Sequence, residues 1–190
     1  MRVVLSFVML FTMGKINAQK LPYYEIPEAP KEYTQGTVAA RMVDGLGFRY
    51  YWATEGLKPK DLSYKPNQEA RSVRETLEHL LVLSVMTLSA VEGKEVVFEK
   101  SDDLVFDDLR KKTLQNFKKT SDILKKSNDL SKFVMKIPRG DNTAEFPFWN
   151  QLNGPIADAI WHVGQIVSFR RSSGNPFPKG VSLLTGKVKK

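Results

Sequence analysis

The chain of 190 residues contains no cysteine and only two histidines, His79 and His162. Without cysteine the protein forms no disulfide and carries no lipid anchor of the lipoprotein type. Packing alone must therefore hold its core together. Histidine chemistry is confined to two positions, and each lies in a stretch whose apolar spacing predicts a helix.

A long apolar run is also lacking. The apolar stretch at residues 3–13 is well short of the roughly 20 residues that span a bilayer. It follows the basic Arg2 and precedes a short segment ending in the small residue Ala18, a pattern typical of a secretory signal peptide. We predict a signal peptide over residues 1–18, cleaved after Ala18, export to the periplasm or the medium, and no stable membrane span. An uncleaved tether is the alternative.

Acidic residues are in the minority, because 21 Asp and Glu stand against 29 Lys and Arg, a formal net charge of +8. Loss of Arg2 and Lys15 with the leader lowers this charge to +6. The lysines are scattered in local clusters, and no nucleic-acid motif accompanies them. We therefore interpret them as solvated helix faces and a basic tail over residues 177–190, and we expect no nucleic-acid partner.

The mature chain of about 172 residues suits one domain with a sizeable core. Residues 19–35, which contain several prolines, predict an extended arm on the surface. Apolar residues at helical spacing then predict four helices, at residues 36–56, 72–93, 103–126 and 147–172. The predicted inward stripe of the first helix is Ala39, Met42, Val43, Leu46, Tyr50, Ala53 and Leu57. Gly45 and Gly47 weaken this helix, so we expect packing or a close neighbour to hold it.

The second and fourth helices carry clear boundary signals. Ser72 and Glu75 form a capping box that opens the second helix, and Gly93 can end it. Pro155, which follows Gly154, should kink or restart the fourth helix because proline has no N–H to donate. These signals fix the positions of the helices that carry the histidines.

The connections indicate how the helices are joined. Residues 94–101 lie between the second and third helices and span roughly 26 Å at about 3.3 Å per residue. This is close to the length of a helix, so the two helices can run parallel with the link beside them. Residues 132–137 predict a strand in the next connection. We therefore predict an all-α protein, a four-helix bundle over residues 36–176 with a crossover link.

Polar residues interrupt the apolar faces of the second and fourth helices. Asp158 precedes His162 by four residues, so both side chains share one helix face, while His79 lies in the second helix. A buried ionised aspartate is costly unless it is paired or binds a metal. Two interpretations remain at this point: the three residues form one metal site, or Asp158 pairs with Arg170 or Arg171 and the histidines are ordinary core residues.

A family resemblance bears on this choice. The strings RSVRETLEHL and, about eighty residues later, DAIWHVGQIVSFRRSSGNP resemble the DinB-like (YfiT-type) superfamily of four-helix-bundle metalloproteins, over nearly all of the mature chain. The resemblance implies an up-down-down-up bundle with a crossover between helices two and three, often as a homodimer. It also implies three histidine ligands, one from the second helix and an H-x-x-x-H pair from the fourth. His79 and His162 match the first and last of these positions, and Asp158 stands at the remaining one.

The resulting prediction is one divalent metal ion bound by His79, Asp158 and His162. Two histidines and one carboxylate suit a catalytic zinc with an open position and also the facial site of non-haem iron, and nickel or manganese are alternatives. A two-metal ferritin-like site would need two E-x-x-H motifs, but Thr76 and Ala159 occupy the positions three before the histidines.

The predicted function is that of an exported metal-dependent hydrolase acting on a small molecule. The alternative is a non-enzymatic metal-binding or interaction bundle whose site has diverged. Some members of the resembled family are S-transferases or isomerases that use cytoplasmic thiols, and the leader argues against that activity here.

Several other side chains are candidates for supporting roles. Glu75 is a candidate general base, although the capping box is its simpler duty, and Gln165 is a candidate hydrogen-bond donor behind the ligands. Tyr50 and Tyr51 either approach the site or pack in the core. Arg170 and Arg171 either bind an anionic group of the substrate or pair with acids at the end of the bundle. Only the fold can decide among these roles.

Overall fold

The computed structural model describes residues 20–98, 100–101 and 103–189, so the predicted signal peptide at residues 1–18 lies outside the described residues. The protein is mostly helical, as the sequence predicted. Its helices are α1 (Gln35–Thr54), α2 (Pro59–Leu62), α3 (Val73–Glu92), α4 (Phe106–Leu124), α5 (Trp149–Gln151), a π-helical segment (Leu152–Ile156) and α6 (Ala157–Ser172). Two small strand pairs accompany them, β1 (Met135–Arg139) with β2 (Asn142–Phe146) and β3 (Val181–Ser182) with β4 (Lys187–Val188).

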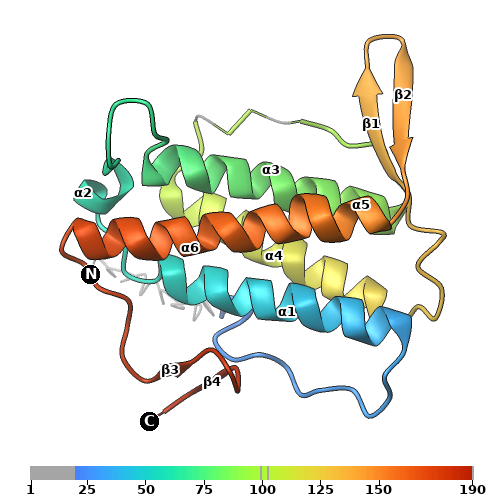
Figure 1. The fold of residues 1–190 in the computed structure, drawn as a ribbon, viewed down its shortest axis with the longest axis horizontal. Helices are drawn as coiled ribbons and strands as arrows, with labels where there is room; N and C mark the ends of the chain where they lie inside the picture. The colour runs from blue at the N-terminus through green and yellow to red at the C-terminus, as the bar shows by residue number, and fades with distance from the viewer. Residues whose placement is uncertain (1–19, 99, 102, 190) are drawn as a thin grey trace, which may run out of the picture.

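The four long helices α1, α3, α4 and α6 lie side by side (Figure 1). Each of α3 and α1 contacts both α4 and α6, so the apolar faces of all four meet in one core. That core includes Leu46 from α1, Leu77 from α3, Phe117 from α4 and Ile166 from α6, all with essentially no exposed surface. Burial of such side chains stabilises each by about 1.5–3 kcal/mol and sets the rotation of every helix. Among the described residues, no helix combines the length and the apolar character needed to cross a membrane.

Helix α1 follows its predicted stripe with one correction. Met42 was expected to face inward, but it is exposed, whereas its neighbour Val43 is fully buried. The stripe that passes through Val43 fills the contact with α4, so Met42 is rotated out of it. Gly47 has the close neighbour that its position suggested, because a Cβ atom there would lie 2.4 Å from the ring of Tyr23 in the N-terminal arm. Glycine at this position allows the arm to lie on the helix.

The ends of α3 agree with the sequence signals. The Ser72 hydroxyl accepts a hydrogen bond from the Glu75 backbone N–H, and the Glu75 carboxylate accepts one from the Ser72 N–H at 2.6 Å. Gly93 ends the helix in the left-handed conformation at φ 70°. Helix α4 begins at Phe106, three residues later than the predicted start at residue 103, because Leu104 N–H bonds to the Ser101 carbonyl in a turn instead.

The link between α3 and α4 runs back along α3 and meets the base of the β1–β2 hairpin (Figure 1). Glu95 and Lys136 form a parallel bridge, and Val96 is buried in a small cluster with Ala90 and Met135. The strand predicted at residues 132–137 is observed slightly later, as β1, and its antiparallel partner β2 was not predicted. The apolar link is therefore anchored at one end by this hairpin.

The helix that carries the Asp158 and His162 pair is interrupted where the sequence predicted a kink. Gly154 has non-helical angles, φ −95° and ψ −111°, and Pro155 follows it within the π-helical segment. Proline cannot donate a backbone hydrogen bond, so the regular ladder is broken at this point. Helix α6 restarts one residue before Asp158, which therefore lies in its first turn.

The C-terminal segment was predicted only as a basic tail over residues 177–190. Its described part instead forms the β3–β4 hairpin and packs against the arm and α1. Ile26 N–H donates to the Gly186 carbonyl, and Ile26 packs with Phe48, Trp52 and Val188. Apolar residues between the lysines thus find a partner that the local sequence does not reveal.

Candidate metal centre

His79 from α3 meets Asp158 and His162 from α6 at the seam between the two helices. The spacing of four on α6 stacks Asp158 and His162 on one face, and the packing of α3 against α6 turns His79 toward them. One ligand atom from each residue lies within 4.8 Å of the others. The three residues that the sequence nominated as metal ligands are therefore close enough to share one ion.

The geometry centres on the carboxylate. Asp158 Oδ2 lies 3.0 Å from His79 Nε2, and Asp158 Oδ1 lies 3.3 Å from His162 Nε2. The two imidazole rings are nearly perpendicular, with centroids 4.7 Å apart. Both Nε2 atoms thus point at the same carboxylate from different sides.

Gln165 determines which nitrogen of His162 carries the proton. Its Oε1 atom lies 2.7 Å from His162 Nδ1. An amide oxygen can only accept, so Nδ1 is the donor of this hydrogen bond. In the neutral ring Nε2 is then left with a lone pair, directed at Asp158. The sequence placed Gln165 behind the ligands, but as a donor; the structure makes it an acceptor that orients the ring.

The cluster is only partly shielded from solvent. The side chains of His162, His79 and Asp158 are 13%, 27% and 39% exposed. They therefore stand at the edge of the core, where a metal or a small molecule can reach them without unfolding the protein. Because 39% of the Asp158 side chain is exposed, its carboxyl group loses less hydration than a fully buried one.

The alternative pairing of Asp158 with Arg170 is wrong, because the Asp158 carboxylate contacts His79 and His162 instead. Arg170 is buried, 2% exposed, at the far end of α6. Its guanidinium donates to the carbonyls of Trp52 and Ala53 and to two oxygens of Asn175. Arg170 therefore ties the end of α6 to the end of α1, while Arg171 is exposed on the surface.

The remaining candidates have structural contacts. Glu75 is exposed and binds Ser72 in the capping box, and the same hydrogen bonds lower the pKa of its carboxyl below the usual value. Tyr50 is fully buried and packs edge to face on Phe117, and burial raises its pKa strongly. Tyr51 packs beneath the guanidinium of Arg110. Packing, the simpler of the two roles considered for the tyrosines, fits these contacts.

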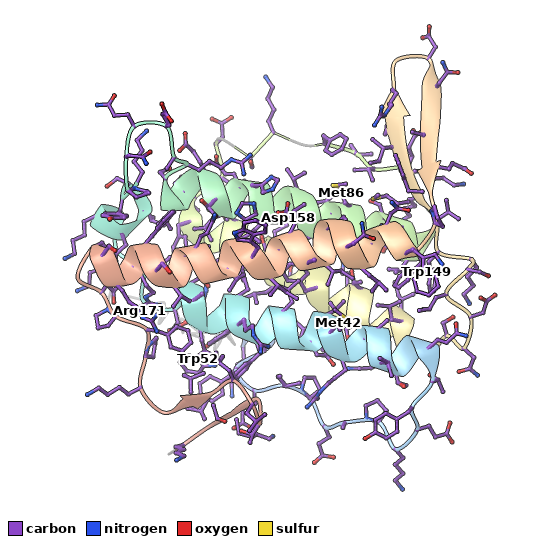
Figure 2. All side chains as sticks on the ribbon, in the orientation of Figure 1. Met42, Trp52, Met86, Trp149, Asp158 and Arg171 are labelled. Atoms are coloured by element: carbon purple, nitrogen blue, oxygen red, sulfur yellow. The ribbon has the colours of Figure 1, made fainter. Side chains whose placement is uncertain are left out.

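A groove of about 580 Å³ adjoins the cluster on the seam between α3 and the kinked helix. Its wall includes Asp158 itself, Leu83 and Met86 from α3, and Pro155 and Trp161 from the last helix. Figure 2 shows Asp158 and Met86 along this seam. Trp161 was not singled out from the sequence, although its position three after Asp158 places it on a neighbouring part of the same helix surface.

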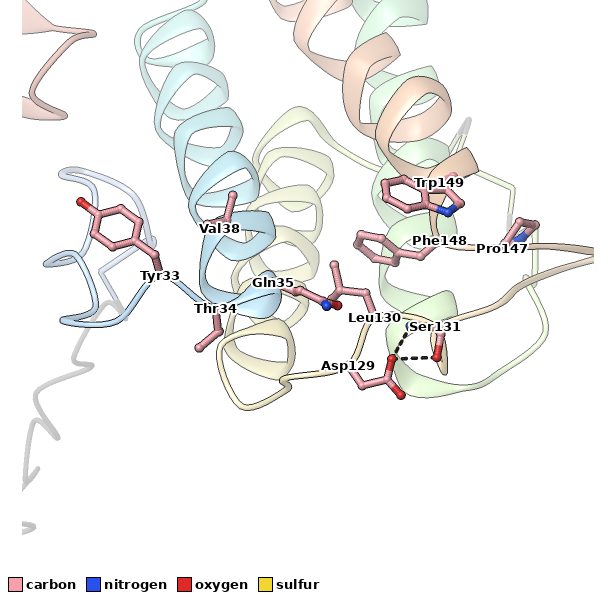
Figure 3. Close-up of a pocket in the computed structure, with 10 residues that line it drawn as sticks. All are labelled: Tyr33, Thr34, Gln35, Val38, Asp129, Leu130, Ser131, Pro147, Phe148 and Trp149. Carbon is pink, nitrogen blue, oxygen red and sulfur yellow. Dashed lines mark hydrogen bonds between the residues drawn. The ribbon is translucent and has the colours of Figure 1, made fainter.

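The largest hollow lies elsewhere. A pocket of about 650 Å³ opens at the start of α1, opposite the beginning of α5 (Figure 3). Tyr33, Val38, Phe148 and Trp149 line it, and Asp129 accepts hydrogen bonds from the Ser131 N–H and hydroxyl at its rim. Within the part of the chain that the structure describes, this lining holds a single carboxylate and no cation. It lacks the convergent polar groups of the metal cluster.

Comparison of the chain with models of known protein families and with curated proteins finds no match.

Proposed function

We propose that the protein binds one divalent metal ion through His79, Asp158 and His162. The contact between His162 Nε2 and Asp158 Oδ1, at 3.3 Å, carries this proposal. With Nδ1 donating to Gln165, a neutral imidazole would turn the lone pair of Nε2 toward the carboxylate oxygen. Such a contact is repulsive unless positive charge lies between the two atoms. A shared metal ion supplies that charge. His79 Nε2, which donates to Asp158 Oδ2 at 3.0 Å, would bind the same ion on giving up its proton.

The donor set defines which ions suit the site. Two imidazole nitrogens and one carboxylate oxygen match zinc, and they also match iron, nickel and manganese. With three protein ligands, coordination positions remain for a substrate. The partial exposure of Asp158 supports access to them from solvent.

We further propose that the chain is an exported DinB-like protein. Three features support this: the leader-like residues 1–18, the two ligand strings, and long helices whose crossover link runs back along α3 (Figure 1). The proposed order is an up-down-down-up four-helix bundle. N-terminal sequencing of protein recovered from the periplasm or medium tests the leader, with Gln19 as the expected first residue.

The proposed chemistry is hydrolysis of a small carbonyl compound. When bound, a divalent metal supplies a Lewis acid that lowers the pKa of water towards about 7 or polarises a carbonyl. Gln165 fixes the ring of His162, and Asp158 Oδ2 accepts a hydrogen bond from His79 Nε2 and positions that ring. The side chains thus position the reacting groups before the substrate arrives.

Elemental analysis of the purified full chain tests the metal centre. Wild type should carry about one equivalent of metal, and Asp158→Ala and His79→Ala should each lose it. Glu75→Gln, one turn before His79, should retain it, because Glu75 serves the helix cap. Stoichiometric metal in both ligand variants would end the proposal. A panel of esters and amides then separates a hydrolase, active only with metal, from a metal-binding protein.

A further inference from the structure

We infer that the groove beside Asp158 binds the apolar part of the substrate, and that the substrate is an amphipathic ester or amide with an uncharged alkyl or aryl group. This rests on the proposed metal centre. The observation behind it is that Asp158 belongs both to the three-ligand cluster and to the groove wall. A molecule whose polar head reaches the cluster therefore extends its remainder along the groove.

The groove lining determines what that remainder can be. Leu83 and Met86 form the wall on α3, and Pro155 and Trp161 form the opposite wall. Asp158, a member of the three-ligand cluster, is the one charged side chain among the described residues of the lining, and the uncharged Asn153 is the other polar one. With largely apolar walls and no cation in its lining, the groove disfavours phosphate or carboxylate groups in the tail and favours a hydrocarbon.

One wall of the groove carries the exposed aromatic side chain of Trp161. Its side chain is 71% exposed, which is unusual for so large an apolar group and leaves an aromatic face available to a ligand. The kink at Gly154 and Pro155 opens the space beside it, because the helix backbone departs from its regular path there. The kink and the tryptophan thus shape one wall of the site.

Alkyl hydroxamates test this inference, since the hydroxamate head chelates metals and the tail can be varied. Calorimetry on the zinc-loaded full chain should show octanohydroxamate binding at least about tenfold more tightly than acetohydroxamate, as burial of several methylene groups requires. A hydroxamate with a tail of the same length that ends in a carboxylate should lose most of this gain. Quenching of tryptophan fluorescence by the octyl compound gives an independent readout.

Two matched variants locate the effect. Trp161→Ser should reduce the octyl advantage several-fold while leaving zinc content and acetohydroxamate affinity unchanged. Trp149→Ser is the control, since Trp149 is similarly exposed, at 75%, but lines the other pocket. If protein that holds zinc through the three ligands binds short and long hydroxamates with equal affinity, the inference about the groove is wrong. The proposed metal centre is not contradicted by that result. Wild type that holds no zinc overturns both.

Discussion

Two polar clusters on α6, one near its start and one at its end, are built in opposite ways. At the end, the Arg170 guanidinium meets only oxygen acceptors, so every contact there pairs a donor with an acceptor. Near the start, the Nε2 atoms of His79 and His162 both face the carboxylate of Asp158. The first cluster pairs protein donors with protein acceptors, whereas the second brings together three side chains that can each bind a metal ion.

This difference separates a structural cluster from a functional one. Arg170 is buried, and burial lowers its pKa, against the charges of Asp61 and Glu55, which raise it. A buried charge held by several hydrogen bonds stabilises the native fold only while all its partners are present. The partly exposed side chains of His79, Asp158 and His162 can be reached from solvent and can bind a ligand instead.

The largest expected effect comes from Arg170→Met. Removing the guanidinium leaves buried carbonyls of α1 without donors, so the free energy of unfolding should fall by about 3 kcal/mol or more. Urea denaturation measures this, with the exposed Arg171→Met as control at within about 0.5 kcal/mol of wild type. Similar losses of unfolding free energy in the two variants would contradict the distinction between the clusters. Loss of bound metal in Arg170→Met would contradict it as well.

Zinc should stabilise wild type by about 2.7 kcal/mol at a free concentration one hundred times its dissociation constant, because only the folded chain brings the ligands together. Thermal unfolding with and without zinc measures the shift in Tm. Asp158→Ala should show no shift, while its unfolding without zinc should stay close to that of wild type. A shift of the same size in this variant would place the stabilising ion elsewhere.

Asp61→Asn should lower the free energy of unfolding by about 2 kcal/mol at neutral pH. The Asp61 carboxylate is buried and accepts hydrogen bonds from Ser173, Asn175 and the Lys58 N–H; burial raises its pKa, but these bonds outweigh burial and lower it overall.

The direction of the pH dependence follows from that lowered pKa. The unfolded chain binds the proton more readily, so this stability is complete above the ordinary pKa of about 4 and is lost as the pH falls through the folded value. Denaturation midpoints of wild type and Asp61→Asn should therefore converge in acid. Parallel curves down to low pH would contradict the assignment.

The smallest effect should come from Gln165→Leu. This change removes the acceptor that orients His162, and the metal dissociation constant should rise about tenfold, or 1.4 kcal/mol. Competition with a chromophoric chelator measures it, and Ser168→Ala on the same helix is the control. Unchanged affinity would mean that the ring of His162 is held by packing alone.

The sequence predicted the helices and the shared face of Asp158 and His162 because both depend on local spacing. The capping box at Ser72 and the kink at Pro155 are visible in neighbouring residues, and they appear where predicted. The exposure of Met42 and the contacts of Arg170 were not predicted correctly, since each depends on a partner from a distant segment. The same holds for the β3–β4 hairpin, which needs Ile26 of the arm to cover its apolar side.

By itself the sequence determined that Asp158 and His162 share a helix face, because a spacing of four residues is nearly one full turn. It could not determine that His79 faces them, because one residue of helix rotation turns a side chain through about 100°. Tertiary packing of α3 against α6 fixed that rotation, since the core accepts only one set of apolar faces. The same packing, with the kink, decided that Asp158 also lines a largely apolar groove.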